Sequence, residues 1–235
     1  MFKKNQEKDK KMIEIFKNKM EETFKEKDLK NMNNNILTLE ITTYNLLLSK
    51  ILQHLTDTNG CYNIDSNQIK IYQEDDTIYH ELLHLSCNNR KGENNIIGFD
   101  RHVIKEKYIL SFGVGLNEIY TEILTNRLFG KEIIEPISKT IELVLLLEQL
   151  INNFSSLYLN SDLYELVLEL SEYTSINESL DFIYNIDRLF EIEMQNNIRK
   201  RDKEKYRAIY QKTLYFLKQY QYKKEKQEQK KKILK

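Results

Sequence analysis

Two histidines and a glutamate stand close together in the sequence at a spacing that suits metal binding. His80 and His84 flank Glu81 in the run I-Y-H-E-L-L-H-L, from Ile78 to Leu85. On a helix, residues four positions apart lie on one face about one turn apart, so both imidazoles can reach one ion. Imidazole is a preferred zinc ligand, and a neighbouring carboxylate can accept a proton from water. The spacing predicts a zinc site with His80 and His84 as ligands and Glu81 as general base.

The residues around this run also suit a buried helix, because they are uncharged and include no proline. One alternative remains open at this point. Two packed histidines and an exposed Glu81 on an ordinary helix would give the same letters, and such short motifs do occur by chance. A third ligand is therefore needed to favour the metal site.

A second segment, from Ser111 to Arg127, supplies candidates for that ligand. Glycines at its start predict a turn, and the periodic run that follows predicts a helix carrying Glu118 and Glu122 on one face. A catalytic zinc takes three protein ligands and keeps one position open, and Glu118 fits the third place. Glu122 can accept a hydrogen bond from the free ring nitrogen of a liganding histidine. The alternative is a solvated helix face.

Taken together, the two segments resemble the zincin-type (HExxH) zinc metallopeptidases of the gluzincin, or thermolysin-like, group. The third ligand of that group is a glutamate in an Asn-Glu pair on a following helix, with an acidic residue one turn later. Asn117-Glu118 and Glu122 match this pattern, and the resemblance covers about 72–127. It implies peptide-bond hydrolysis, with Zn²⁺ as cofactor and a metal-bound water that Glu81 activates. It also implies a peptide or protein substrate.

A hydrolytic site of this kind also needs a donor for the oxyanion that forms when water attacks a carbonyl. His102 and Tyr108 lie between the two ligand segments, and Tyr120 and Tyr79 stand beside the proposed ligands. Any of the four can serve. A plain structural role is the alternative for each, and spacing does not choose among them.

The resemblance and the hydrophobic pattern predict an α+β fold that is mostly α-helical. A small zincin-like core with a short edge β-sheet and an active-site helix would precede a helical C-terminal subdomain. An amphipathic N-terminal helix is expected at 1–30 and the catalytic core at 31–130. The helical subdomain is expected at 131–222, followed by a basic, disordered tail at 223–235.

Within the core, the sequence predicts a break at Asn33–Asn35 and then a helix as far as Leu55. Alternation at 68–73 predicts a strand, interpreted as the edge strand that pairs with an extended substrate. The polar stretch 88–98 predicts a surface loop, and two short extended pieces are expected within 96–110, around the charged stretch 100–107. Four helices are expected beyond Gly130, at 137–151, 162–173, 177–194 and 201–221.

Composition limits the other function classes. The 235 residues carry a net charge of zero, so no overall attraction to nucleic acid or anionic membrane is expected. The first thirty residues contain no continuous apolar stretch of the signal-peptide type, and the longest apolar run, 143–147, is too short to span a bilayer. We therefore expect a cytoplasmic protein without a membrane span. Cys61 and Cys87 are expected to be reduced, and Cys87 to be a buried small residue rather than a ligand.

Two rival functions stay open on the sequence alone. The chain can be a non-catalytic helical interaction or regulatory protein whose HExxH run is a remnant or a structural site. It can also bind zinc as a module without turnover. Metal content separates the first rival from a peptidase, and peptide hydrolysis separates the second.

Overall fold

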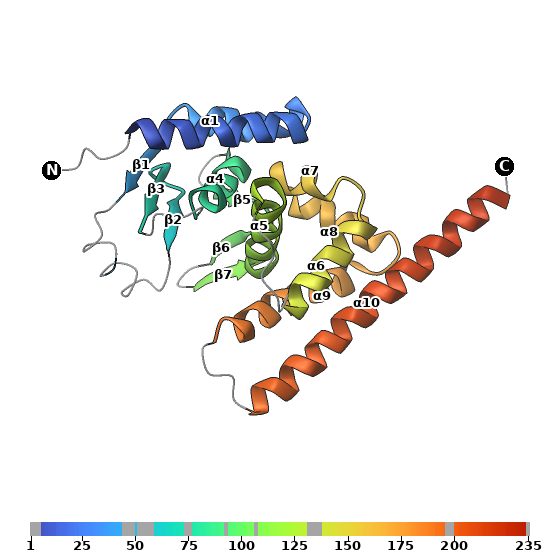
Figure 1. Ribbon diagram of the computed structural model, residues 1–235. Coiled ribbons are helices and arrows are strands. Elements are labelled where there is room, and N and C mark those ends of the chain that lie inside the picture. Colours follow the sequence, from blue (N-terminus) through green and yellow to red (C-terminus); the bar gives the residue numbers. More distant parts are fainter. Residues whose placement is uncertain are drawn as a thin grey trace. The chain divides into compact units, whose positions relative to one another are not determined.

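The structure, a computed structural model, describes residues 6–43, 50, 59–72, 77–91, 94–105, 108–130, 138–195 and 200–233. The chain is α+β and mostly helical, as the sequence predicts (Figure 1). It divides into two compact units. The first comprises Met1–Gly98, Leu124–Glu132 and Leu159–Ser161, and the second comprises Phe99–Ile123, Ile133–Tyr158 and Asp162–Lys235.

The first unit begins with three helical elements. They are α1 (Gln6–Thr23), the 3₁₀ helix η1 (Glu26–Leu29) and α2 (Lys30–Ile36). The predicted amphipathic pattern is confirmed, because Phe16 and Met20 are fully buried while most charged residues of α1 are exposed, but the helix predicted over 1–30 ends at Thr23. The Phe16 ring stacks on Phe129 at 5.6 Å. In Figure 1, α1 runs beside α4 (Thr77–Cys87), so the helix docks on its unit rather than projecting from it.

The small sheet of the first unit has the order β1-β3-β2. Its strands are β1 (Glu40–Thr43), β2 (Gly60–Asn63) and β3 (Gln68–Ile71). The prediction that 68–73 forms the edge strand is wrong, because β3 pairs with β1 in parallel and with β2 antiparallel. Ile69 and Ile71 are both buried. Their alternation therefore indicated a strand correctly, but alternation carries no information about which position in the sheet a strand takes.

The predicted break at Asn33–Asn35 is also wrong, because these residues lie within α2. Asparagine is a poor helix former on its own, but tertiary hydrogen bonds override that preference. Asn35 is buried, and its side-chain amide donates to two backbone carbonyls of another segment, those of Leu85 and Asn88. Asn35 thus caps the end of a neighbouring helix, α4, and does not end the helix in which it lies.

The helix expected from there to Leu55 is contradicted over Glu40–Thr43, which forms β1. Ile41, Thr42 and Thr43 are β-branched, and such side chains fit a pleated strand better than a helix. Most of the remaining predicted helix lies outside the described residues.

The stretch predicted as a polar loop forms a hairpin instead. β4 (Asn88–Lys91) pairs antiparallel with β5 (Asn94–Ile97), with Asn88 opposite Ile97. Backbone pairing at the end of α4 stabilises extended structure here although the side chains are mostly polar. Two short extended pieces are confirmed in the next stretch, where β6 (Arg101–Lys105) and β7 (Tyr108–Phe112) form an antiparallel hairpin in the second unit. However, β6 lies within the charged stretch 100–107, which was expected to separate the two pieces.

Helices make up the rest of the second unit. They are α5 (Val114–Phe129, which the first unit shares from Leu124), α6 (Lys139–Leu150), α7 (Phe154–Leu159), α8 (Leu163–Ser171), α9 (Ile176–Glu193) and α10 (Lys200–Ile233). The four predicted helices are confirmed, and α7 was not predicted. Side chains of Ser138, Asp162 and Ser175 cap α6, α8 and α9, and Ser175 forms a capping box with Glu178.

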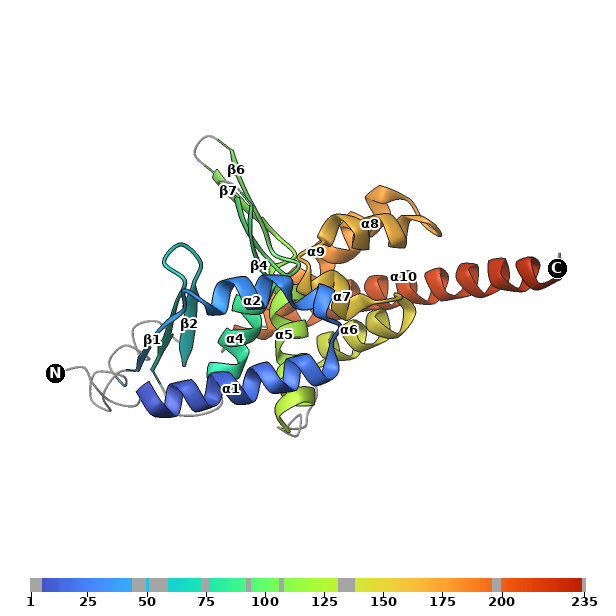
Figure 2. The ribbon, with the colours of Figure 1, turned by 90° about the horizontal axis from the view of Figure 1, so that it is seen from above.

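The last helix is longer than predicted. Helix α10 packs on α6 and α9, and it then continues through the basic tail to Ile233, beyond the other helices of its unit (Figure 2). Disorder was expected there, but Lys, Glu and Gln are good helix formers and extend a helix that packing has already nucleated. Among the described residues, no helix is long and apolar enough to cross a membrane.

Candidate metal centre

The helix that carries the two histidines, α4, is buried along most of its length. Nine of its residues are buried, and its last carbonyls therefore need partners from the protein. The Asn35 amide donates to the carbonyls of Leu85 at 2.9 Å and Asn88 at 2.7 Å, and the Ser161 hydroxyl donates to the Cys87 carbonyl. These contacts fix the end of α4 within the first unit.

His80 and His84 present the same ring nitrogen to one point. Their Nε2 atoms lie 3.0 Å apart, and their rings meet edge to face with centroids 4.7 Å apart. Two nitrogens bound to one tetrahedral zinc at about 2.0–2.1 Å lie roughly 3.3 Å apart. The pair thus has nearly the spacing that a shared ion requires. His84 is buried and His80 is half-buried.

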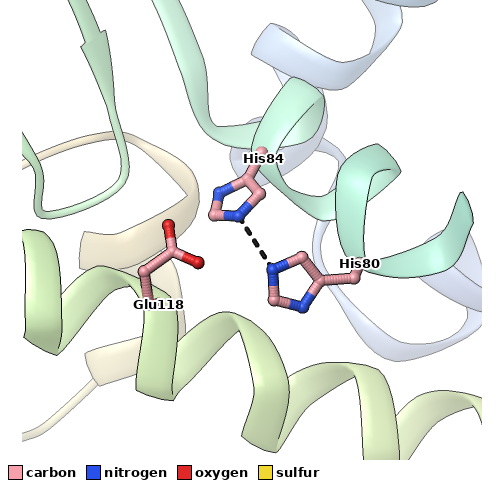
Figure 3. A group of neighbouring side chains, drawn as sticks. All are labelled: His80, His84 and Glu118. Atoms are coloured by element: carbon pink, nitrogen blue, oxygen red, sulfur yellow. Dashed lines mark hydrogen bonds between the residues drawn. The ribbon is translucent and has the colours of Figure 1, made fainter. Parts of the chain in front are cut away.

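Glu118, from α5, completes a group of three possible ligands. One ligand atom from each of His80, His84 and Glu118 lies within 4.8 Å of the others, and in Figure 3 the carboxylate faces the two rings. Two imidazoles and a carboxylate are a known donor set of catalytic zinc. Tetrahedral coordination needs ligand atoms roughly 3.3–3.5 Å from one another, and side-chain movements of about 1 Å would bring the three ligand atoms to that spacing. In the described part of the chain, no other such group of His, Cys, Asp or Glu occurs.

Glu81, the predicted general base, is buried beside the first histidine, with 6% of its surface exposed. Strand β2 passes close to it at Gly60. A Cβ atom added to Gly60 would lie 3.5 Å from Glu81 Oε1 and 2.9 Å from Thr77 Cγ2. The distance to Thr77 Cγ2 is shorter than a real Cβ atom shows, so the absence of a side chain at Gly60 lets β2 pass close to the start of α4, whereas the distance to Glu81 Oε1 is ordinary van der Waals contact. A glycine within a strand often marks such a close approach of a backbone.

The other acidic candidate, Glu122, lies one turn after Glu118 on α5, and its side chain is exposed. Its role as hydrogen-bond partner of a liganding histidine stays a prediction. Tyr120 is fully buried, and its hydroxyl lies 2.7 Å from both Glu148 Oε1 and Ser155 Oγ. These contacts favour the structural alternative for Tyr120.

The remaining oxyanion candidates are distributed over three elements. His102 lies in β6 and Tyr108 in β7, and their side chains lie outside what the structure describes. Tyr79 is buried and stacks on Phe129 with ring centroids 4.2 Å apart, which is a packing contact. The choice among these donors stays open.

The helix that carries Glu118 directly follows a glycine and is capped from another helix. Gly113 has φ +82°, and a Cβ atom there would lie 2.1 Å from the Phe99 carbonyl oxygen. Asp187 of α9 accepts hydrogen bonds from the backbone N–H groups of Gly113, Gly115 and Leu116. Burial raises the pKa of Asp187 to about 6, although these three hydrogen bonds act to lower it.

Both cysteines are free thiols, as expected. Cys87 is fully buried at the end of α4 and is not part of the ligand group. Cys61 is half-buried in β2, with its sulfur 3.6 Å from the Tyr72 hydroxyl. The expectation that Cys87 fills space rather than binding the ion agrees with this placement.

Comparison with known proteins adds no further support to the site. The resemblance drawn from the sequence rests on two short segments and on the residue types at matching positions within them. A family assignment would require similarity over much more of the chain. No protein-family model, curated protein or solved structure matches this chain.

Proposed function

We propose that this chain is a zinc-dependent metallopeptidase that hydrolyses peptide bonds. The observation that carries the proposal is the convergence of His80, His84 and Glu118, whose ligand atoms lie within 4.8 Å of one another. These residues come from segments more than thirty positions apart, and they include the only pair of His residues at helical spacing in the sequence. Such convergence is what a shared cation requires.

The three residues would hold the ion and leave a fourth position open for water and substrate. When bound, zinc lowers the pKa of a coordinated water to near 7 and polarises the carbonyl that the water attacks. His84 and Glu81 are buried. Their burial limits competing hydration and keeps both side chains in defined positions, which favours ordered binding over a loose surface association.

Glu81 would carry the proton through the reaction. Its carboxylate accepts one proton from water as the water oxygen bonds to the carbonyl carbon of the substrate. The same proton then passes to the amide nitrogen while the carbon–nitrogen bond breaks, which releases an amine and returns Glu81 to its ionised form. Glu81 directly follows His80 on α4 and is buried, which supports this role.

The proposal predicts that hydrolysis depends on the metal. Purified protein loaded with one equivalent of zinc should cleave peptides in a mixed library, analysed by mass spectrometry. Removal of zinc with a chelator should abolish cleavage, and zinc added back should restore it. Equal cleavage with and without metal would contradict the zinc mechanism. Stoichiometric zinc with no cleavage of the library would instead favour a zinc-binding module without turnover.

A further inference from the structure

The N-terminus of α5 lacks a capping side chain of its own. A helix leaves its first N–H groups without partners inside the helix, and an N-cap side chain usually accepts from the second or third of them. The residue before α5 is Gly113, which has no side chain to offer. Asp187, a residue of α9, acts as the cap instead. Its Oδ1 accepts from the Gly115 nitrogen at 2.9 Å and from the Leu116 nitrogen at 3.4 Å.

The second oxygen of the same carboxylate anchors the turn. Asp187 Oδ2 accepts from the Gly113 nitrogen at 2.7 Å. The two helices approach so closely that a Cβ atom on Gly115 would lie 2.8 Å from Asp187 Cα and 2.8 Å from Phe190 Cβ. Because Gly113 and Gly115 have no side chains, α9 comes close enough for the Asp187 carboxylate to reach the start of α5.

Glu118 lies only two residues beyond the capped N–H of Leu116. Any shift of the first turn of α5 thus moves the Glu118 backbone with it. A metal ligand must be held to a few tenths of an ångström, so the anchor of this turn bears directly on coordination. We propose that Asp187 is a positioning residue, whose carboxylate fixes the start of α5 and thereby sets Glu118 for the metal centre. This inference rests on the proposed function.

The environment of Asp187 supports a functional reason for its burial. Desolvation raises its pKa to about 6, with a smaller contribution from the negative charge of Asp100, which precedes β6 and acts in turn on Arg101. Because folding raises this pKa from 3.8, the stability that the group contributes is present below about 3.8 and is lost as pH rises through about 6. At neutral pH the protein retains an ionised Asp187 at a cost in stability, as is common at functional sites.

The test measures zinc affinity by chelator competition between pH 5 and 8, for the full-length wild type, Asp187→Asn and the matched control Asp181→Asn. Asp181 lies on the same helix, is exposed and pairs with Lys212 at 3.5 Å. At pH 7.5 we expect Asp187→Asn to bind zinc about tenfold more weakly, the range in which supporting residues of metal sites act, and the control to match the wild type. The difference in zinc affinity between wild type and Asp187→Asn should disappear as pH falls through 6, because wild-type Asp187 then becomes protonated.

Each variant is also made in a Glu118→Ala background, where Asp187→Asn should have no further effect on zinc affinity. Equal affinities of wild type and Asp187→Asn at every pH would overturn the inference. So would a loss that is independent of pH or that persists without Glu118, because either result assigns Asp187 a purely structural role.

Two further outcomes are informative. If circular dichroism shows that Asp187→Asn does not fold, Asp187→Glu takes its place in the same comparison. The longer side chain displaces the carboxylate that holds the first turn of α5, so zinc binding should weaken in the wild-type background and not in the Glu118→Ala background, and equal zinc affinities of wild type and Asp187→Glu would overturn the inference. If the wild type binds no zinc at all, the proposed function fails and the role of Asp187 falls with it, which distinguishes that failure from loss of the positioning role alone.

Discussion

Replacing Glu81 by glutamine should leave zinc binding intact and reduce peptide hydrolysis by about 10²–10⁴-fold, the usual contribution of a general base. Glutamine has nearly the same shape as glutamate, so the buried position of this side chain next to β2 is preserved. Its amide cannot accept a proton from the attacking water. The loss should therefore appear in kcat, with a smaller change in KM.

The measurement pairs zinc stoichiometry with kcat and KM on a peptide that the wild type cleaves. Glu122→Gln provides the matched control, since it makes the same chemical change on the neighbouring ligand helix at an exposed position. The control should retain much more activity than Glu81→Gln. Full activity of Glu81→Gln with zinc bound would contradict the role of Glu81 as general base.

Removing Glu118 should have the largest effect on the metal itself. Glu118→Ala deletes a ligand and is expected to weaken zinc binding by well over about 100-fold, whereas loss of a supporting residue costs roughly 10–100-fold. Glu122→Ala should therefore bind zinc more tightly than Glu118→Ala. The difference follows from their positions, because Glu118 belongs to the ligand group and Glu122 is exposed one turn further along α5.

Competition with a chromophoric chelator at pH 7.5 would measure these affinities, with thermal unfolding of the metal-free proteins as the control for folding. Both variants remove one carboxylate from the same helix, so general effects of charge cancel in the comparison. If wild type and Glu118→Ala bind zinc equally well, Glu118 is not a ligand and the third ligand must be sought elsewhere.

The histidine pair was accessible from sequence because its geometry is local. The four-residue spacing of His80 and His84 already fixes both side chains on one face once the segment is helical, and the helix was indicated by its apolar flanks. Glu118 was harder to predict, because no short-range sequence spacing relates α5 to α4. Its identification depended on the Asn-Glu pattern and on the need of catalytic zinc for a third ligand.

The supporting contacts could not be predicted, because they depend on which distant segments meet. Asp187 caps a helix that begins more than seventy positions earlier, and Asn35 caps the end of α4 from fifty positions away. The same limit explains the error over β3. Alternating Ile69 and Ile71 indicated a strand, but its central place in the sheet arises only when β1 and β2 pair with it.

The most direct test of the metal centre is the zinc content of purified protein, measured by elemental analysis side by side for wild type and His84→Ala. His84 is buried, and its Nε2 lies 3.0 Å from that of His80, so its removal leaves too few ligands for tight binding. About one zinc per chain in the wild type, lost in the variant, is the result predicted here. No zinc in either protein, even after reconstitution, would contradict the metallopeptidase proposal and favour a helical interaction protein.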